Sequence, residues 1–155
     1  MAIYKYVLHH SSNTLQKWLL ETLGVWVSTI KKCDYCVDHH FAVLLRLLED
    51  DFKAGQIKEA IDANYLDKAS LNAAQKCAMA YVQKLTQVPS DSTEKDIIAM
   101  RALGYSDGEI LEINQVTAYF AYANRTVLGL GCNTEGDIIG LSPNNSDDPN
   151  DWGHS

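Results

Sequence analysis

Apolar residues recur every three or four positions along most of this chain, the spacing that places side chains on one face of an α-helix. The stretch from Leu15 to about Lys32 shows this clearly, with apolar residues at positions 15, 19, 23, 26 and 30. The pattern predicts helices over about 15–32, 36–52, 57–63, 71–87, 93–103 and 106–128. We expect Gly55 to end the second of these. Since no segment shows the clean alternation of a half-buried strand, we predict an all-α fold, a helical bundle.

The clearest helix start lies at Ser106–Glu109. Ser106 can accept hydrogen bonds from the first free backbone N–H groups, and Glu109 can reach back to the Ser106 N–H, which together form a capping box. Gly129 and Gly131 follow the apolar run, and glycine commonly ends a helix. The sequence therefore predicts a last helix that runs from this cap to about Leu128.

Composition narrows the class of protein. The 155 residues are 46% hydrophobic and 21% charged, which suits a single globular domain. A formal charge of −7 repels a phosphate backbone, so we do not expect nucleic-acid binding. No apolar run approaches the ~20 residues of a membrane span, and the first residues lack the apolar stretch of a secretory signal. We therefore expect a cytoplasmic protein whose four cysteines are free, catalytic or metal-bound.

The end of the chain differs in composition from the rest. Residues 141–155 are acidic and rich in proline and asparagine, and they cannot form a core by themselves. We predict one domain over residues 1–140, followed by this tail. Because tryptophan is uncommon in a freely solvated segment, Trp152 favours an arm that packs on a neighbouring subunit over a frayed terminus.

The residues with the most reactive side chains gather in the segment Lys31–His40, KKCDYCVDHH. If a helix begins near Cys33, the spacing to Cys36 and then to His40 places all three side chains on one face. A helix N-terminus lowers the pKa of a thiol by stabilising the thiolate. Cys33 is nearer to that N-terminus, but His40 is placed to accept the proton of Cys36, which favours Cys36 as the attacking thiol. A CxxC pair at a helix start is typical of reversible dithiol chemistry.

Glu21 is a further candidate for this site. In one continuous helix it would lie ~18 Å from Cys33 and out of reach. If the chain turns back near residues 32–34, two antiparallel helices form a hairpin and Glu21 can approach His40. A carboxylate there would orient the imidazole and stabilise its charge, as the third member of a triad does. From spacing alone, a solvated position on the helix surface is the alternative.

Other roles remain open for the two cysteines. A zinc site would combine them with His40 and a fourth ligand such as His39 or His10, but no second CxxC or HxxxH element follows downstream. Inert buried thiols are another alternative, and a permanent disulfide is disfavoured in a reducing compartment. Reversible redox chemistry is the preferred interpretation. It needs no metal and no cofactor, and no glycine-rich phosphate loop is recognisable in the sequence.

The remaining thiols and histidines have weaker signals. Cys77 lies among small apolar residues, which indicates a core position, and we expect Cys132 to be structural as well. Helix geometry points His39 away from the face that carries the thiols, so we expect a supporting or surface role. His9 and His10 are candidates for lining the site from the amino-terminal side.

These residues resemble a known signature. Glu21 followed by Cys33–His40, CDYCVDHH, is similar to the glutamate-plus-CxxCxxxH motif of the alkylhydroperoxidase D-like proteins, which belong to the carboxymuconolactone decarboxylase superfamily. Residues 104–112 and 119–131 look like the closing helices of that family. The tail looks like that of the subgroup called peroxidase-related enzymes. The resemblance covers most of the chain from about Leu15 onward.

The resemblance implies an all-α fold that assembles as a dimer, trimer or hexamer and acts as a thiol-dependent peroxidase or disulfide reductase. By position, Cys36 corresponds to the cysteine that attacks the peroxide and Cys33 to the resolving cysteine. His40 and Glu21 match the proton-relay histidine and glutamate. We therefore expect a peroxiredoxin-type alkylhydroperoxidase of antioxidant defence. It would reduce alkyl hydroperoxides through a reversible dithiol/disulfide cycle, with an external dithiol or a redox protein as reductant.

Two other classes of protein would use the same cysteines. One is a thiol–disulfide oxidoreductase without natural peroxidase activity, and the other is a non-enzymatic redox-sensing or zinc-binding module. Stoichiometric zinc in the purified protein would favour the module. A decarboxylase or other lyase on the same scaffold needs no CxxC pair, so the intact pair argues against it.

Overall fold

The computed structural model describes residues 2–154, and these residues are all-α, as predicted from the sequence. The helices are α1 (Ala2–Tyr4), α2 (Lys17–Ile30), α3 (Asp34–Leu48), α4 (Asp51–Asp62), α5 (Ala73–Gln87), α6 (Glu94–Ala102) and α7 (Asp107–Leu130). A π-helical turn covers Lys5–His9, and 3-10 turns cover Leu66–Lys68 and Pro89–Asp91. None of the described helices is long and apolar enough to cross a membrane. Met1 and Ser155, the outer ends of the predicted domain and tail, lie outside the described residues.

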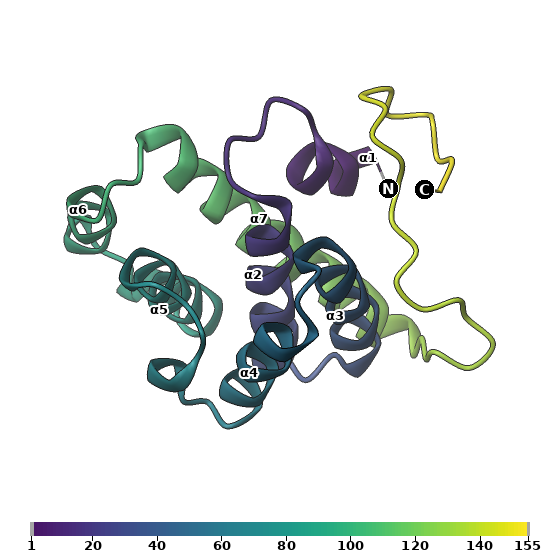
Figure 1. Ribbon diagram of the computed structural model, residues 1–155, viewed down its shortest axis with the longest axis horizontal. Helices are drawn as coiled ribbons and strands as arrows, with labels where there is room; N and C mark the ends of the chain where they lie inside the picture. The colour runs from purple at the N-terminus through teal and green to yellow at the C-terminus, as the bar shows by residue number, and fades with distance from the viewer. Residues whose placement is uncertain (1, 155) are drawn as a thin grey trace.

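Helix α2 is the centre of the bundle. It packs against α3, α5 and α7, and Figure 1 shows it enclosed by the other helices. Residues 19–28 of this helix are all buried, because their side chains are mostly apolar around the whole circumference. Trp26 fixes the contact with α5 by donating a hydrogen bond from Nε1 to the Met79 carbonyl oxygen, 3.1 Å away. A side chain at any of these ten positions is therefore removed from water whichever way it points.

The approach of α7 to α2 depends on one glycine. Gly24 faces the Phe120 ring so closely that a Cβ at this position would overlap the ring carbons. Phe120 is fully buried and meets the His40 ring edge-on, with the ring centroids 4.5 Å apart. The absence of a side chain at Gly24 thus lets α7 place an aromatic wall beside α3.

A tight turn reverses the chain between α2 and α3. Lys32 adopts the left-handed conformation (φ 57°), and its N–H donates to the Thr29 carbonyl. The N–H of Cys33 donates to the Ser28 carbonyl, 2.9 Å away, which completes a Schellman motif. Helix α3 begins at the next residue, so α2 and α3 form the predicted antiparallel hairpin with Cys33 at the N-cap of α3.

The sequence placed one helix boundary wrongly. Gly55 was expected to end the second helix, but it lies inside α4. The helix ends instead where Glu49 turns left-handed (φ 53°), and the side chain of Asp50 then caps α4 by accepting a hydrogen bond from the Lys53 N–H. A strong N-cap therefore decided the boundary, and the separate short helix predicted over 57–63 is the second half of α4.

The predicted start of the last helix is confirmed. Ser106 and Glu109 form both hydrogen bonds of the capping box, at 3.2 Å from the Glu109 N–H to Ser106 Oγ and 2.8 Å from the Ser106 N–H to Glu109 Oε2. The helix continues to Leu130, and Gly131 adopts the left-handed conformation (φ 66°) that ends it.

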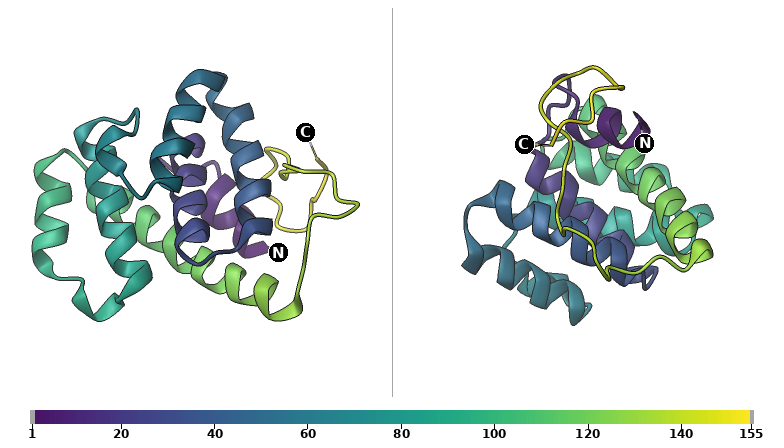
Figure 2. Two further views of the ribbon diagram at one scale, coloured as in Figure 1. Left: turned by 90° about the horizontal axis from the view of Figure 1, so that it is seen from below. Right: turned by 90° about the vertical axis from the view of Figure 1, so that its right-hand side faces the viewer.

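The acidic tail packs on its own chain, beside the amino-terminal turn, as both views in Figure 2 show. Lys5 is buried, and its Nζ donates to the carbonyl oxygens of Asp148 and Asp151, at 2.7 and 2.8 Å. Farther back, Arg46 on α3 donates to the Gly140 carbonyl, 2.7 Å away. Lys5, which is buried, and Arg46, which is exposed, thus bind backbone oxygens of the C-terminal segment. Each also contacts a side chain there: Lys5 Nζ lies 3.4 Å from Asn144 Oδ1, and Arg46 donates to Ser142 Oγ, 2.7 Å away.

Trp152, the expected anchor of the tail, is partly buried against the core of its own chain. Its Nε1 donates to the Pro149 carbonyl, 3.0 Å away. The predicted packing of the tail on a neighbouring subunit stays a prediction.

The close contact at Gly24 gives a test of the packing. Gly24→Ala should lower the free energy of unfolding by about 1–3 kcal/mol, because the added methyl must displace Phe120. Gly55→Ala is the matched control, since no atom lies within 4 Å of its Cβ position and alanine favours a helix interior. It should raise stability by roughly 0.5–1 kcal/mol. Urea unfolding of both variants checks this, and equal effects would contradict the packing described.

Candidate active site

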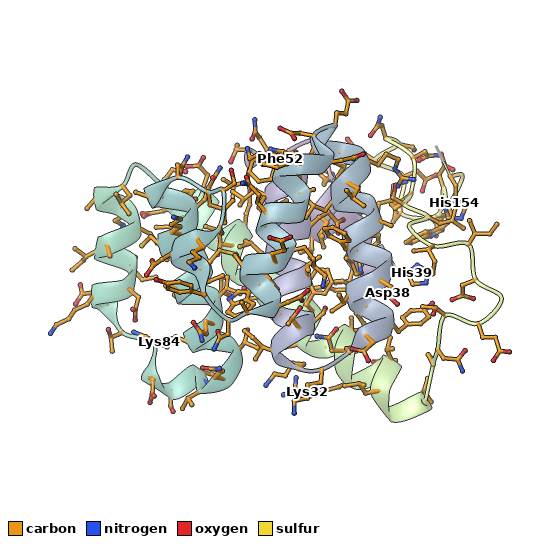
Figure 3. All side chains as sticks on the ribbon, turned by 60° about the horizontal axis from the view of Figure 1, so that its bottom comes forward. Lys32, Asp38, His39, Phe52, Lys84 and His154 are labelled. Carbon is orange, nitrogen blue, oxygen red and sulfur yellow. The ribbon has the colours of Figure 1, made fainter. Side chains whose placement is uncertain are left out.

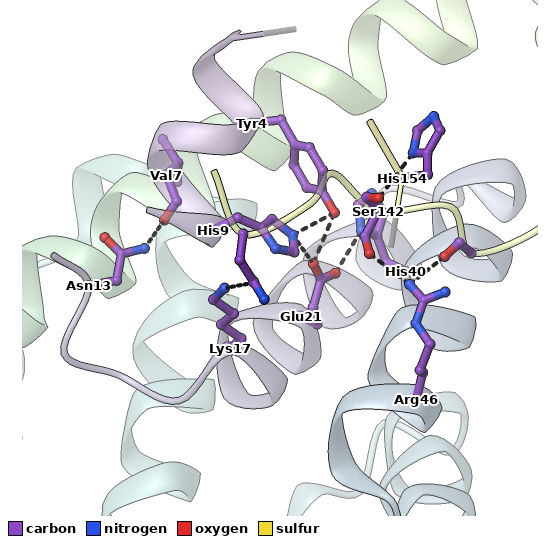
Figure 4. Close-up of polar contacts among 12 residues, drawn as sticks. Tyr4, Val7, His9, Asn13, Lys17, Glu21, His40, Arg46, Ser142 and His154 are labelled. Carbon is purple, nitrogen blue, oxygen red and sulfur yellow. Dashed lines mark hydrogen bonds and ion pairs between the residues drawn. The ribbon is translucent and has the colours of Figure 1, made fainter. Parts of the chain in front are cut away.

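A buried carboxylate connects three parts of the fold (Figure 4). Glu21 on α2 is fully buried, and its Oε2 lies 2.7 Å from Nδ1 of His40 on α3. Its Oε1 lies 3.1 Å from the Tyr4 hydroxyl and 3.2 Å from His9 Nε2, both at the amino-terminal end of the chain. The Tyr4 hydroxyl and His9 Nε2 are themselves 2.9 Å apart. We call these four side chains the Glu21 network.

Charge and hydrogen bonding keep this carboxyl group ionised. Burial by itself would raise the pKa of Glu21, but the charges and hydrogen bonds of His40 and then His9 outweigh burial and lower it to about 2. Burial, and then the Glu21 charge, raise the pKa of Tyr4 well above its usual value. The Tyr4 hydroxyl therefore stays protonated and donates a hydrogen bond to Glu21 Oε1.

The protonation of Glu21 determines the tautomer of His40. An ionised carboxylate can only accept hydrogen bonds, so His40 must donate to it from Nδ1–H. The neutral ring then has its lone pair on Nε2. The arrangement leaves His40 with an acceptor nitrogen, which is the state that a general base requires.

The predicted approach of Glu21 to His40 is therefore confirmed. Of the two histidines considered near the amino terminus, His9 reaches the network, while His10 does not and accepts from the Ser12 N–H through Nδ1. Tyr4 was missed. Its only sequence signal is the spacing of five to His9, which is too common to identify a site.

The two thiols lie together at the start of α3. Cys33 Sγ and Cys36 Sγ are 2.7 Å apart, both cysteines are free, and both are buried. The sulfurs are close enough to form a disulfide with little movement of the backbone. Within residues 2–154, no group of three or more histidine, cysteine, aspartate or glutamate side chains gathers as a metal site would require, including those proposed for zinc.

The Cys36 thiol does not have the lowered pKa expected from a helix start. Burial, followed by the hydrogen bond and charge of Cys33, raises the pKa of Cys36 above its usual value. The positive end of α3 is offset here because Cys36 is only 3% exposed and a thiolate would lose its hydration. The Cys36 thiol is therefore protonated at rest. Among the described residues, Cys36 pairs with Cys33 and makes no direct hydrogen bond to His40.

A cavity of about 330 Å³ opens beside His40. It is lined mainly by aromatic and aliphatic side chains: Tyr4, Tyr35, His39, His40, Val43, Tyr119, Asp137, Ile138 and Leu141. His39, predicted to point away from the thiols, lies on the side of α3 that faces the tail (Figure 3), with its Nε2 3.3 Å from Asp137 Oδ2. The segment that follows α7 thus forms one wall of this cavity, through Asp137, Ile138 and Leu141, and we call it the His40 cavity.

The other candidate residues lie outside the Glu21 network. Cys77 is partly buried against the core, as expected. Cys132, predicted to be structural, is exposed instead, just after the end of α7. Asn124 on α7 is buried, and its Oδ1 accepts a hydrogen bond from Ser28 Oγ on α2, 3.1 Å away.

Comparison with solved structures places the chain in a family. A peroxidase-related protein from Silicibacter sp. TM1040 is 30% identical, with a TM-score of 0.77 over 88% of this chain and 70% of that chain. A second peroxidase-related protein, from Ralstonia eutropha JMP134, described as an alkylhydroperoxidase AhpD core, is 26% identical. Its TM-score is 0.75, over 92% of this chain and 73% of that chain. No protein-family model and no curated protein sequence matches the chain.

The identity and coverage of the Silicibacter protein define the class. This chain belongs to the alkylhydroperoxidase D-like family of peroxidase-related proteins. The resemblance drawn from the glutamate and the CxxCxxxH segment is confirmed at the level of the family.

The low pKa of Glu21 predicts how acid affects stability. In the unfolded chain this carboxyl has a pKa near 4.5, against about 2 when folded. The unfolded state binds more protons between these values, so the stabilisation is complete above about pH 4.5 and is lost as pH falls toward 2. The loss should be about 3 kcal/mol for this one group.

Urea unfolding between pH 2 and 5 measures this effect. Glu21→Gln should remove most of the pH dependence that this group contributes, whereas Glu59→Gln, at an exposed position on α4, should leave it in place. A Glu21→Gln protein with the wild-type slope would show that folding does not lower the pKa of this carboxyl.

Proposed function

We propose that this protein is a thiol-dependent peroxidase that reduces alkyl hydroperoxides through a Cys33–Cys36 dithiol/disulfide cycle. The observation that carries the proposal is the geometry of the site: two buried sulfurs 2.7 Å apart, one helical turn before a histidine whose Nδ1 is fixed by an ionised carboxylate. The likeness to proteins named peroxidase-related and alkylhydroperoxidase supports an enzyme of this kind.

The first step is the oxidation of Cys36. His40 Nε2 accepts the thiol proton, and the thiolate attacks the outer oxygen of the hydroperoxide. The O–O bond breaks, Cys36 becomes a sulfenic acid, and the alkoxide takes the proton back from His40 to leave as an alcohol. Glu21 stabilises the imidazolium between these two transfers, as the carboxylate of a triad does.

The second step closes the disulfide. The Cys33 thiol attacks the sulfenic sulfur of Cys36, and the hydroxyl leaves as water. An external dithiol then restores both thiols by exchange, becoming a disulfide itself. Two electrons pass from that dithiol to the peroxide in each cycle, and no metal or organic cofactor takes part in this scheme.

The burial of the thiols supports a role for the base. Since burial raises the pKa of Cys36, little thiolate is present before a base acts, and the reaction depends on His40 being in its acceptor form. The His40 cavity, with its aromatic and aliphatic lining, is suited to the organic group of an alkyl hydroperoxide.

Steady-state turnover of cumene hydroperoxide with dithiothreitol tests the proposal. Cys36→Ser should abolish turnover and Cys33→Ser should stop it after one sulfenic acid forms. His40→Gln should lower the rate by roughly 10²–10⁴-fold, because the base is lost. His10→Gln is the matched control, since that histidine lies outside the network and bonds only to its own loop.

Two results would contradict the proposal. Sulfenic acid that forms on Cys33 in the Cys36→Ser variant would show that Cys33, and not Cys36, is the thiol that attacks the peroxide. Disulfide reduction without any peroxide turnover would favour the thiol–disulfide oxidoreductase instead.

A further inference from the structure

A second cavity, of about 250 Å³, opens at the start of α3. Its lining residues are Lys32, Cys33, Asp34, Tyr35, Asp38, Val127, Leu128, Cys132, Asn133 and Thr134. Tyr35 alone also lines the His40 cavity. We call this second opening the Cys33 cavity. The site is therefore bordered by two cavities, one at the histidine and one at the resolving thiol.

The Cys33 cavity borders only one residue of the thiol pair. Both sulfurs belong to buried residues, with Cys33 at 0% and Cys36 at 3% exposure. Of the pair, Cys33 borders this cavity, and Cys36 borders neither cavity. A thiol that approaches from this side therefore meets the Cys33 sulfur and leaves Cys36 as the departing thiolate.

A third thiol stands on the rim of the same cavity. Cys132 is exposed and lines the Cys33 cavity from the end of α7. Its backbone is fixed, because its N–H donates to the Val127 carbonyl, 3.1 Å away, after the left-handed Gly131. This is the Schellman closure that also holds Cys33 at the end of α2. Two helix ends thus hold a buried thiol and an exposed thiol at one cavity.

The electrostatics agree with this proximity. The charge of a Cys132 thiolate contributes to the raised pKa of Cys36, after burial and the effects of Cys33. It also contributes to the raised pKa of Tyr35, whose first cause is likewise burial.

We propose that Cys132 is a third redox cysteine, which carries the disulfide from the buried pair to the surface, where an external dithiol reduces it. The proposal rests on the peroxidase cycle above and adds the route of its reductive half. The Cys132 thiolate attacks Cys33 Sγ, the Cys33–Cys36 bond breaks, and Cys36 leaves as a thiolate that takes up a proton. A thiolate of the external dithiol then attacks Cys132 and releases Cys33. Its second thiol displaces Cys132, so that the reductant ends as a disulfide and all three cysteines as thiols.

The position of Cys132 lets it react with the buried disulfide faster than a thiol in solution can. A dithiol in solution must enter a cavity of about 250 Å³ to meet Cys33 directly. A thiol already held at the rim converts this encounter into an intramolecular step with a high effective concentration. The exchange with the external dithiol then takes place at an exposed sulfur.

Disulfide mapping tests the transfer itself. Full-length Cys36→Ser protein, oxidised with diamide and alkylated, should contain a Cys33–Cys132 disulfide. Trypsin places these cysteines in different peptides, 33–46 and 126–155, so the link is visible by mass spectrometry. Cys77 lies in a third peptide and serves as the internal control. Recovery of unlinked Cys33 and Cys132 overturns the proposal.

Reduction kinetics provide a second measurement that does not depend on the folding of Cys36→Ser. Diamide converts wild-type protein to the Cys33–Cys36 disulfide, and dithiothreitol then reduces it. Cys132→Ser should slow this reduction by at least about tenfold, because the intramolecular step is lost. Cys77→Ser should reduce at the wild-type rate.

The two proposals fail in different ways. A Cys132→Ser protein reduced as fast as wild type overturns the relay, whatever its peroxide activity. If the wild-type protein, oxidised with diamide, is reduced through Cys132 but turns over no peroxide, the role of Cys132 stands and the proposed peroxidase activity is wrong.

Discussion

The site depends on one buried charge. Removing a carboxylate from water costs several kcal/mol unless other groups compensate it, and Glu21 is fully buried on α2. His40, His9 and Tyr4 supply that compensation. Because these donors come from α3 and from the first residues of the chain, the amino-terminal segment is held over the site by the same charge that orients the histidine.

Two other features of the fold fix the geometry of the Glu21 network. The Schellman turn at Lys32 reverses the chain so that Glu21 and His40 meet from opposite sides of the hairpin. Gly24 lets Phe120 approach and pack edge-on against the imidazole. A ring held by a carboxylate on one side and an aromatic wall on another loses little freedom when it accepts a proton, which is the preorganisation that acid–base chemistry needs.

Patterns local in sequence were predictable. The helical period, the capping box at Ser106 and the hairpin that joins Glu21 to His40 all rest on interactions between nearby residues or on one turn. The helix boundary at Glu49 was not predictable, because a favourable N-cap at Asp50 outweighed the tendency of Gly55 to end a helix. The thiol pKa was misjudged for a physical reason: spacing reveals a helix start, but it does not reveal how completely the neighbours of Cys36 exclude water. Tyr4 and the placement of the tail depend on long-range packing that no local pattern encodes.

The central claim is that an ionised Glu21 fixes the tautomer of His40, so that Nδ1 carries the proton donated to the carboxylate and the neutral ring has its lone pair on Nε2. Nitrogen-15 NMR of the histidine rings, recorded at a pH where the rings are neutral and assigned by comparison with the His40→Gln protein, tests it directly. The account predicts a protonated Nδ1 and an unprotonated Nε2 for His40. A ring with its proton on Nε2 would mean that the carboxylate does not accept from His40, and it would contradict the account.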